Sequence, residues 1–288
     1  MTCKVCDSTS IRERFKIFEN KAICRCNNCG TEFLYPQLND AELTKLYSET
    51  YYTPWGLAGS AENEALKRMK IATFNLRLNT VKTFVTNGKL LDVGCATGYL
   101  LEAANEKGFD VYGVEFSEYS SQIAKQKFGN HKIHNGILES SPFTNGFFDV
   151  ITMFDLIEHV RVPQIVLEKA KQLLSDSGVI MISTPDTGST SHALMGKRWT
   201  HYKLEHFFYF NRASMNLAAD RSGLKVVHYE RSKKALTLNY LYLQFKTYKH
   251  WLFTPLSGML YALASKRLRE RNFYFPIGEM TVVLKRSN

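Results

Sequence analysis

The hydrophobic pattern of this chain alternates short apolar runs with longer amphipathic segments. Five runs have the length and flanks of buried strands: 89–92, 110–115, 131–135, 148–154 and 178–183. The segments between these runs are long enough to form helices. Strands that alternate with helices predict a parallel, doubly wound sheet. We therefore expect an α/β fold whose functional site lies beyond the carboxyl ends of the strands.

A helical pattern precedes the first of these runs. Ile71, Phe74, Leu78, Val81 and Val85 recur every three or four residues. This spacing puts them on one face of a helix, which we expect to pack on the sheet.

The C-terminal part predicts a helix over 211–223, a strand over 224–229 and a last strand over 279–285. Between the two strands, residues 231–275 form an insertion rich in lysine, arginine and aromatic residues, with apolar residues at helical spacing. Residues 251–264 are too few to span a bilayer. The insertion can act as a lid over the acceptor site, as a dimer surface or as a contact with a membrane surface, and we favour the first two.

The first strand runs into a tight turn, Gly94-Cys95-Ala96-Thr97-Gly98. Its small residues fall at i, i+2 and i+4, whereas a dinucleotide-binding turn has them at i, i+2 and i+5. A strand, a tight turn and a helix let the backbone approach a nucleoside cofactor closely. Glu115 ends the second strand, where a carboxylate can accept hydrogen bonds from both hydroxyls of a ribose.

Asp92 stands two residues before the first glycine, and the segment resembles motif I of the class I S-adenosylmethionine (SAM) methyltransferases. Ala96 replaces the middle glycine of that motif. The resemblance implies a seven-stranded, mostly parallel sheet with an antiparallel last strand, and SAM as the cofactor. The cofactor-binding residues expected from it are Asp92, Gly94, Cys95, Ala96, Gly98, Glu115, Ile137, Leu138 and Phe154, with the adenine ring beside Ile137 and Leu138.

Two CxxC pairs lie near the N-terminus. Cys3 and Cys6 form one, and Cys26 and Cys29 form the other. Each pair can place two thiolates on one tetrahedral zinc ion, so we expect a structural zinc ribbon with a hairpin over 11–22. Cys24 is an alternative to Cys26 as a ligand, and reduced, buried thiols are the alternative to zinc.

The residues after the cysteines extend the resemblance. Three aromatic and apolar segments follow the cysteines: residues 33–36, residues 43–47 and Tyr51-Tyr52. Their order resembles that in bacterial sugar methyltransferases with an N-terminal zinc-binding segment, including C-methyltransferases of nucleotide-linked deoxysugars. We therefore divide the chain into a zinc ribbon (1–36), a helical linker (37–86) and a SAM-dependent methyltransferase domain (87–288).

A Glu-His pair after the fifth strand is the first candidate for catalysis. A sugar hydroxyl is too weak an acid to ionise near neutral pH, so methyl transfer needs a base, and histidine suits that task. The pair Glu205-His206 resembles the one proposed as catalytic in the sugar C-methyltransferases. We expect His206 to be the base and Glu205 to orient it, with Tyr202 and His201 as substrate contacts.

A second pair, Glu158-His159, follows the fourth strand. We expect His159 to position the cofactor or the acceptor. This stretch is also similar to the ubiquinone-pathway O-methyltransferases. That resemblance implies that Asp155, Glu158 and His159 stand at positions where a divalent metal can bind. Asp155 and His159 would share one helix face if a helix began at Asp155.

Composition narrows the class of protein. The 288 residues are 44% hydrophobic, enough for a sizeable core, and 37 basic against 27 acidic residues give a net charge of +10. This charge favours an anionic partner such as a nucleotide-sugar, a glycan, nucleic acid or a membrane surface, without deciding among them. The chain shows neither a signal peptide nor an apolar run of membrane-spanning length, so we expect a cytoplasmic protein.

Together these patterns predict a SAM-dependent methyltransferase with a structural zinc ion. Its expected acceptor is a nucleotide-linked or surface-glycan sugar, methylated on oxygen or carbon. The alternatives are a quinone or lipid O-methyltransferase at a membrane surface, and a non-catalytic zinc-ribbon module that binds nucleic acid or protein. We expect no stable nucleic-acid partner, and the sequence leaves open a homodimer and a peripheral membrane contact.

Overall fold

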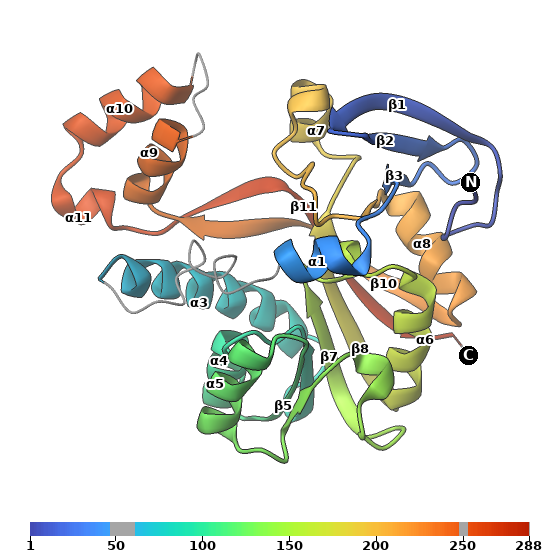
Figure 1. The fold of residues 1–288 in the computed structure, drawn as a ribbon. Helices are drawn as coiled ribbons and strands as arrows, with labels where there is room; N and C mark the ends of the chain where they lie inside the picture. Colours follow the sequence, from blue (N-terminus) through green and yellow to red (C-terminus); the bar gives the residue numbers. More distant parts are fainter. Residues whose placement is uncertain (47–60, 248–252, 288) are drawn as a thin grey trace.

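The computed structural model describes residues 1–46, 61–247 and 253–287. Tyr51 and Tyr52, on which part of the sequence resemblance rests, lie outside these ranges. Figure 1 shows a central sheet with helices on both faces, a small second sheet near the N-terminus and a group of helices at the end of a long hairpin. Within the described ranges, no helix is long and apolar enough to cross a membrane.

The central sheet has seven strands in the order β10-β11-β8-β7-β4-β5-β6, and only the pairings of β11 are antiparallel. The predicted doubly wound, mostly parallel sheet is therefore confirmed. The strands are β4 (Gly88–Val93), β5 (Phe109–Glu115), β6 (Ile133–Asn135), β7 (Phe148–Phe154), β8 (Leu174–Pro185), β10 (Leu224–Leu236) and β11 (Phe273–Arg286).

Successive residues of the strands bury alternate faces of the sheet. Leu90 and Val150 join a core with α3 and α4, whereas Leu91 and Ile151 join a second core with α6 and α8. Both faces are thus covered, which is why the strands read as continuous apolar runs. The helices of the domain are α3 (Ala61–Lys82), α4 (Tyr99–Glu106), α5 (Glu118–Phe128), α6 (Pro163–Leu173), α7 (Thr190–Met195) and α8 (Arg212–Arg221).

The predicted helix before the first strand is α3. Leu78 and Val81 are fully buried on the sheet, and Ile71 and Phe74 pack around them; Val85 also packs there but lies beyond the end of α3 at Lys82. A shorter helix, α1 (Asp40–Leu46), follows the ribbon.

The N-terminal ribbon is built into the main domain instead of standing apart. Its strands are β1 (Ile11–Phe18), β2 (Lys21–Cys26) and β3 (Glu32–Tyr35), so the predicted hairpin is present. A fourth strand, β9 (Phe208–Tyr209), pairs with β3 and comes from the segment that carries His206. The ribbon and that segment therefore share one sheet.

The C-terminal insertion is less helical than the sequence predicts. Strand β10 continues to Leu236 and β11 begins at Phe273, so both ends of the predicted 231–275 insertion are strand. Residues 231–234 are polar, but they form strand because they pair with β11. The helical part lies between the strands and comprises α9 (Leu238–Thr247), α10 (Phe253–Leu263) and α11 (Lys266–Arg269).

Candidate functional site

The turn after β4 has the backbone shape that a close approach to a ligand requires. Gly94, Ala96 and Gly98 all have positive φ, at 80°, 47° and 86°. A Cβ atom at Gly98 would lie 2.6 Å from the Phe128 ring, and one at Gly94 would lie 3.1 Å from Leu156. These glycines therefore have no room for a side chain, and Ala96 tolerates the strained conformation because its side chain is small.

Glu115 is held rigidly beside this turn. One carboxylate oxygen accepts a hydrogen bond from the Ala96 amide at 2.9 Å, and the other accepts one from the Ser117 amide at 2.8 Å. Burial raises the pKa of Glu115, although both amide hydrogen bonds act against the rise. Each oxygen keeps a lone pair, so the side chain is prepared to accept hydrogen bonds from a ribose.

The other predicted cofactor residues divide into accessible and supporting positions. Asp92 is buried, accepts a hydrogen bond from the Thr152 hydroxyl at 2.7 Å and has its pKa raised to about 7 by burial. The Cys95 side chain packs in the core against Gly113, and Leu138 is buried too. Ile137 is 49% exposed and can contact a ligand.

Phe154, the last residue of β7, stacks on Phe74 of α3, with ring centroids 6.3 Å apart. This contact attaches the end of the strand to the helix and limits how far Phe154 can turn toward a cofactor.

Replacing Glu115 by alanine should weaken SAM binding by at least about 100-fold, because hydrogen bonds to a charged group contribute about 1.5–3 kcal/mol each and the variant lacks two for ribose. Isothermal calorimetry measures this. Glu106→Ala, an exposed glutamate at the end of α4, is the matched control and should bind normally. An affinity for Glu115→Ala close to that of the unchanged protein would contradict the ribose assignment.

The two Glu-His pairs, separated by 45 residues in the chain, meet in the structure. The rings of His159 and His206 lie edge to face with centroids 4.7 Å apart. Glu158, His159 and His206 each offer one donor atom, and these atoms lie within 4.8 Å of one another. The Phe207 amide donates to the Glu158 carbonyl at 2.7 Å, which holds the two segments together. We call these three residues the Glu158–His159–His206 group.

The group lies next to the glycine turn. Strand β7, which it follows, pairs directly with β4. Leu156, between Phe154 and this group, is the residue that approaches Gly94. A ligand on the turn therefore has the histidines near it.

Burial sets the charge of this group. It raises the pKa of Glu158 to about 8, with Asp155 adding to the effect, and it lowers the pKa of His159 to about 4. Burial and the neighbouring His159 hold the pKa of His206 well below its usual range. Near neutral pH both imidazoles are uncharged and one can accept a proton. Among the described residues, no group hydrogen-bonds to His206 Nδ1.

The expected helix from Asp155 is absent. Asp155 has a φ of 54°, and only a 3-10 turn (Ile157–His159) follows it. The condition under which Asp155 and His159 would share a helix face is therefore not met. Asp155 instead pairs with Lys234 at 3.2 Å and Arg77 at 3.7 Å. Beyond the end of β7, the described donor atoms that lie close enough together to hold a divalent metal belong to the Glu158–His159–His206 group, which does not include Asp155.

A network of charged side chains, which the sequence did not indicate, lies at the carboxyl end of β7. Arg77 and Lys234 both pair with Glu279, at 3.2 and 2.7 Å, as well as with Asp155. Lys70 lies close to Lys234, and burial together with this neighbour lowers the pKa of Lys70 to about 8. These residues come from α3, β10 and β11, so no local pattern could have indicated their meeting.

Tyr202 and His201 take part in the framework of the site. The Tyr202 hydroxyl donates to Glu32 of β3 at 2.6 Å and also contacts His192 and Arg14. The His201 ring hydrogen-bonds to the Ile277 carbonyl at 2.8 Å. These partners use the polar atoms that we expected to contact substrate.

The segment between Tyr202 and His206 is bound to both neighbours. The backbone of Glu205 hydrogen-bonds to His159. The Leu34 amide of β3 donates to the Phe207 carbonyl at 3.0 Å. The ribbon thus helps to hold the segment on which His206 lies.

Glu32→Gln should destabilise the protein by about 1.5–3 kcal/mol at pH 7, since it removes the charge from a fully buried carboxylate that accepts hydrogen bonds, while its partner Arg14 is partly exposed. Burial would raise the pKa of Glu32, but hydrogen bonds from His192, Tyr202 and Arg14 outweigh it and keep the pKa low. A carboxylate with a lowered folded-state pKa stabilises above its unfolded pKa, about 4.3, and this contribution is lost as the pH falls through the folded value.

Urea unfolding at several pH values tests this prediction. The difference between the unchanged protein and Glu32→Gln should shrink in acid, whereas Glu13→Gln, on exposed β1, should show no difference at any pH. A difference that is independent of pH would rule out an ionised Glu32.

The four predicted zinc ligands gather at one end of the ribbon. Cys3 Sγ lies 3.7 Å from Cys29 Sγ, and Cys6 Sγ lies 3.4 Å from Cys26 Sγ. All four sulfur atoms lie within 4.8 Å of one another. Tetrahedral zinc with bonds of about 2.3 Å separates its sulfur ligands by about 3.8 Å, so the spacing fits. Cys24 lies in β2 outside this cluster, so the geometry favours Cys26.

A family model described as a methyltransferase domain matches residues 66–229, more than half of the chain. The chain belongs to this methyltransferase family. The sheet order and the glycine turn described above are those of the class I methyltransferase fold, which is Rossmann-like. The matched range contains the turn, Glu115 and both Glu-His pairs of this methyltransferase.

Among curated proteins, the methyltransferase resembles the ubiquinone biosynthesis O-methyltransferase of Haemophilus ducreyi, with 35% identity over 126 residues that cover 38% of this chain and 51% of the relative. It also resembles the ubiquinone biosynthesis O-methyltransferase of one strain of Pseudomonas aeruginosa, with 28% identity over 120 residues that cover 38% of this chain and 50% of the relative. The chain thus spans about half the length of the curated relatives it matches. One similar solved structure is 1,6-didemethyltoxoflavin-N1-methyltransferase from Burkholderia thailandensis with bound 1,6-didemethyltoxoflavin and S-adenosylhomocysteine. The two structures match with a TM-score of 0.55 at 10% sequence identity, and the match covers 96% of this chain and 100% of the Burkholderia chain. This likeness supports the fold.

Proposed function

We propose that this methyltransferase uses SAM to methylate a hydroxyl oxygen or a carbon atom of a nucleotide-linked or surface-glycan sugar. The observation that carries the proposal is the meeting of His159 and His206 beside the glycine turn. An imidazole that is uncharged at neutral pH and lies next to a nucleoside-binding turn can accept the proton of an acceptor.

The residues around the turn fit SAM. Gly94, Ala96 and Gly98 let the backbone approach a nucleoside, and Glu115 is oriented to accept from its ribose. When bound, SAM supplies an electrophilic methyl group on a sulfonium sulfur. His206 would accept the proton of the acceptor hydroxyl, or the proton next to a keto group if carbon is methylated. His159 would position the acceptor, and the protonated Glu158 can donate a hydrogen bond within the group.

The charged network supports a polar, anionic acceptor. Lys234 keeps 27% of its side chain exposed at the carboxyl end of β7, with Lys70 near it. Cations at this position would attract the phosphates of a nucleotide-sugar. A quinone ring offers no such charge.

A quinone or lipid O-methyltransferase is the second candidate. It is favoured by the curated relatives, which are named for ubiquinone biosynthesis. Their likeness covers only about two fifths of this chain, so it does not decide the acceptor.

We also propose that Cys3, Cys6, Cys26 and Cys29 bind a structural zinc ion. Four thiolates are a soft, closed ligand set, which suits structural zinc. Thr31, whose hydroxyl lies 3.1 Å from Cys29 Sγ, can support one thiolate. Thr31 precedes Glu32, so the metal cluster adjoins the buried ion pair that holds Tyr202.

The acceptor is tested by incubating the purified protein with methyl-labelled SAM and a cell extract, followed by separation into nucleotide-sugar, glycan, lipid and nucleic-acid fractions. The His206→Ala protein serves as the control for label that is transferred by other enzymes. Label in the sugar fractions that depends on His206 supports the proposal and identifies the acceptor.

Other distributions of label point elsewhere. His206-dependent label in lipid would replace the sugar by the quinone or lipid acceptor. Label in nucleic acid would reject both, and SAM binding without transfer in any fraction would favour the non-catalytic module.

A further inference from the structure

Helix α10 presents an apolar stripe to solvent. It contains no charged residue from Phe253 to Leu263. Leu256, Met259, Leu260 and Leu263 are 41%, 54%, 45% and 80% exposed. Their spacing of i, i+3, i+4 and i+7 places them along one side of the helix. Single exposed apolar side chains are common on protein surfaces, but four aligned on one helix indicate a surface that meets an apolar partner.

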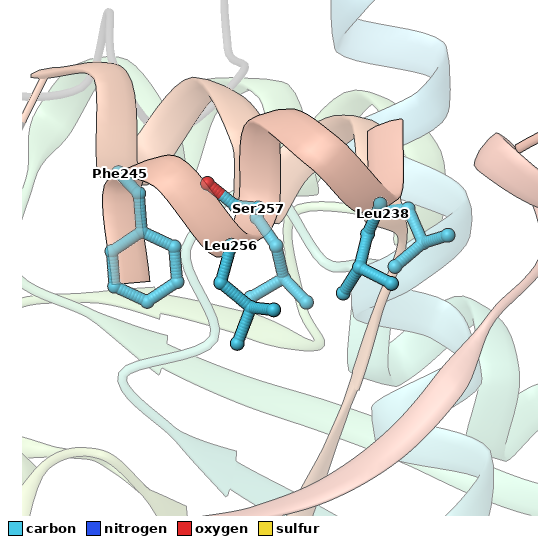
Figure 2. A pocket seen from close by; sticks show the side chains of 6 residues that line it. Leu238, Phe245, Leu256 and Ser257 are labelled. Atoms are coloured by element: carbon cyan, nitrogen blue, oxygen red, sulfur yellow. The ribbon is translucent and has the colours of Figure 1, made fainter. Parts of the chain in front are cut away.

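The stripe continues into a groove between α9 and α10. Leu238, Leu241 and Phe245 of α9 face Leu256 and Leu260 of α10 across a cavity of about 90 Å³. Figure 2 shows Leu238, Phe245 and Leu256 directed to the same side of the two helices. Apart from Ser257, the groove is lined by apolar residues, so it offers little for a polar ligand to bind.

Basic residues border this apolar surface. Helix α11 and the residues after it carry Lys266, Arg267, Arg269 and Arg271. The Arg269 guanidinium lies 4.1 Å from the centre of the Tyr261 ring, and Tyr261 stacks on Tyr242 at 4.3 Å. Leucines beside tyrosines and arginines form the arrangement that suits the boundary between acyl chains and lipid headgroups.

The charge of the segment indicates which kind of partner the apolar surface binds. Residues 238–272 contain six lysines and arginines and one acidic residue, Glu270. Two copies of this surface brought face to face would repel each other. An anionic bilayer attracts the cations and also accepts the apolar stripe. We propose that α9, α10 and α11 dock on the surface of an anionic lipid bilayer, with α10 lying in the headgroup region.

The hairpin connects this docking surface to the site. The helices stand at the end of β10 and β11 (Figure 1), and the same strands carry Lys234 and Glu279 of the charged network. The end of the hairpin that carries the helices is fastened to α3, since the Ala235 amide donates to the Thr73 hydroxyl at 3.0 Å. A bilayer held by the helices would therefore lie at a set distance from the site. This inference concerns binding alone and does not depend on the acceptor proposed above.

Sedimentation of the full chain with lipid vesicles tests the proposal. We expect binding to phosphatidylcholine vesicles that contain about 30 mol % phosphatidylglycerol and little binding to pure phosphatidylcholine. Salt at about 0.5 M should weaken the binding, because it screens the basic residues. The double variant Met259→Glu/Leu263→Glu should bind at least about tenfold more weakly, since it removes two apolar contacts and adds two negative charges.

The matched control is Ile165→Glu on α6. Ile165 is 51% exposed, close to the 54% of Met259, and lies outside the helix group, so its substitution should leave vesicle binding unchanged. Circular dichroism and SAM calorimetry check that each variant is folded. The proposal is overturned if the unchanged protein does not bind anionic vesicles, if the double variant binds as well as the control, or if the double substitution instead converts a dimer to a monomer in light scattering.

Discussion

Replacing His206 by alanine should reduce methyl transfer by about 1000-fold while SAM affinity changes less than about twofold, because a positioned general base contributes about 100- to 10,000-fold to a rate. His206 is the buried member of the Glu158–His159–His206 group whose Nδ1 has no hydrogen-bond partner in the described chain. Initial rates at saturating SAM measure the loss, and calorimetry measures the affinity. The exposed His131 provides the control, because His131→Ala should leave both unchanged.

The pH profile gives an independent readout of the same residue. An imidazole with an ordinary pKa loses its function as a base when the pH falls through about 6.5. Burial and His159 hold the pKa of His206 well below that value, so it stays uncharged in weak acid. The rate should therefore remain nearly constant from pH 7.5 to about pH 6. A rate for His206→Ala within about tenfold of normal, or an acid limb centred near pH 6.5, would assign the proton transfer to another group.

Removing zinc should lower the melting temperature by more than about 10 °C, because a structural zinc site contributes its binding free energy directly to folding. The double variant Cys26→Ser/Cys29→Ser should show the same loss as chelation. Elemental analysis of the unchanged protein should find one zinc ion per chain. Cys24→Ser is the matched control: Cys24 is buried in the same ribbon but outside the cluster, so this variant should keep its zinc.

Loss of the metal should also reach the site. Strand β3 follows Cys29 and pairs with β9, two residues beyond His206. Glu32 of β3 also holds Tyr202. Metal removal should therefore reduce turnover much more than SAM affinity, because the glycine turn follows β4 and Glu115 ends β5, and these are not strands of the ribbon sheet. A protein that contains no zinc, or a double cysteine variant that melts like the control, would refute the structural metal.

The cofactor half of the protein was predictable from the sequence because its determinants are local. The turn between Gly94 and Gly98 is specified by small residues at fixed spacing, and Glu115 by its place at the end of the next apolar run. The structure confirms the strands and the mostly parallel sheet, and it shows positive φ angles at Gly94, Ala96 and Gly98. Within this half, the side-chain environments of Asp92, Cys95, Leu138, Phe154 and Asp155 needed the folded protein, since burial depends on neighbours from other elements.

The acceptor half was decided by tertiary contacts. The sequence indicated Glu158-His159 and Glu205-His206 as two separate candidates, but nothing local shows that they meet. Arg77 reaches Glu279 across 202 positions of the chain, and Tyr202 is drawn to Glu32 across 170. Residues 231–234, which look like part of a basic insertion, become strand only because β11 returns to pair with them. Sequence spacing thus determined the fold and the cofactor turn, whereas long-range packing and desolvation decided which residues form the catalytic group and what charge they carry.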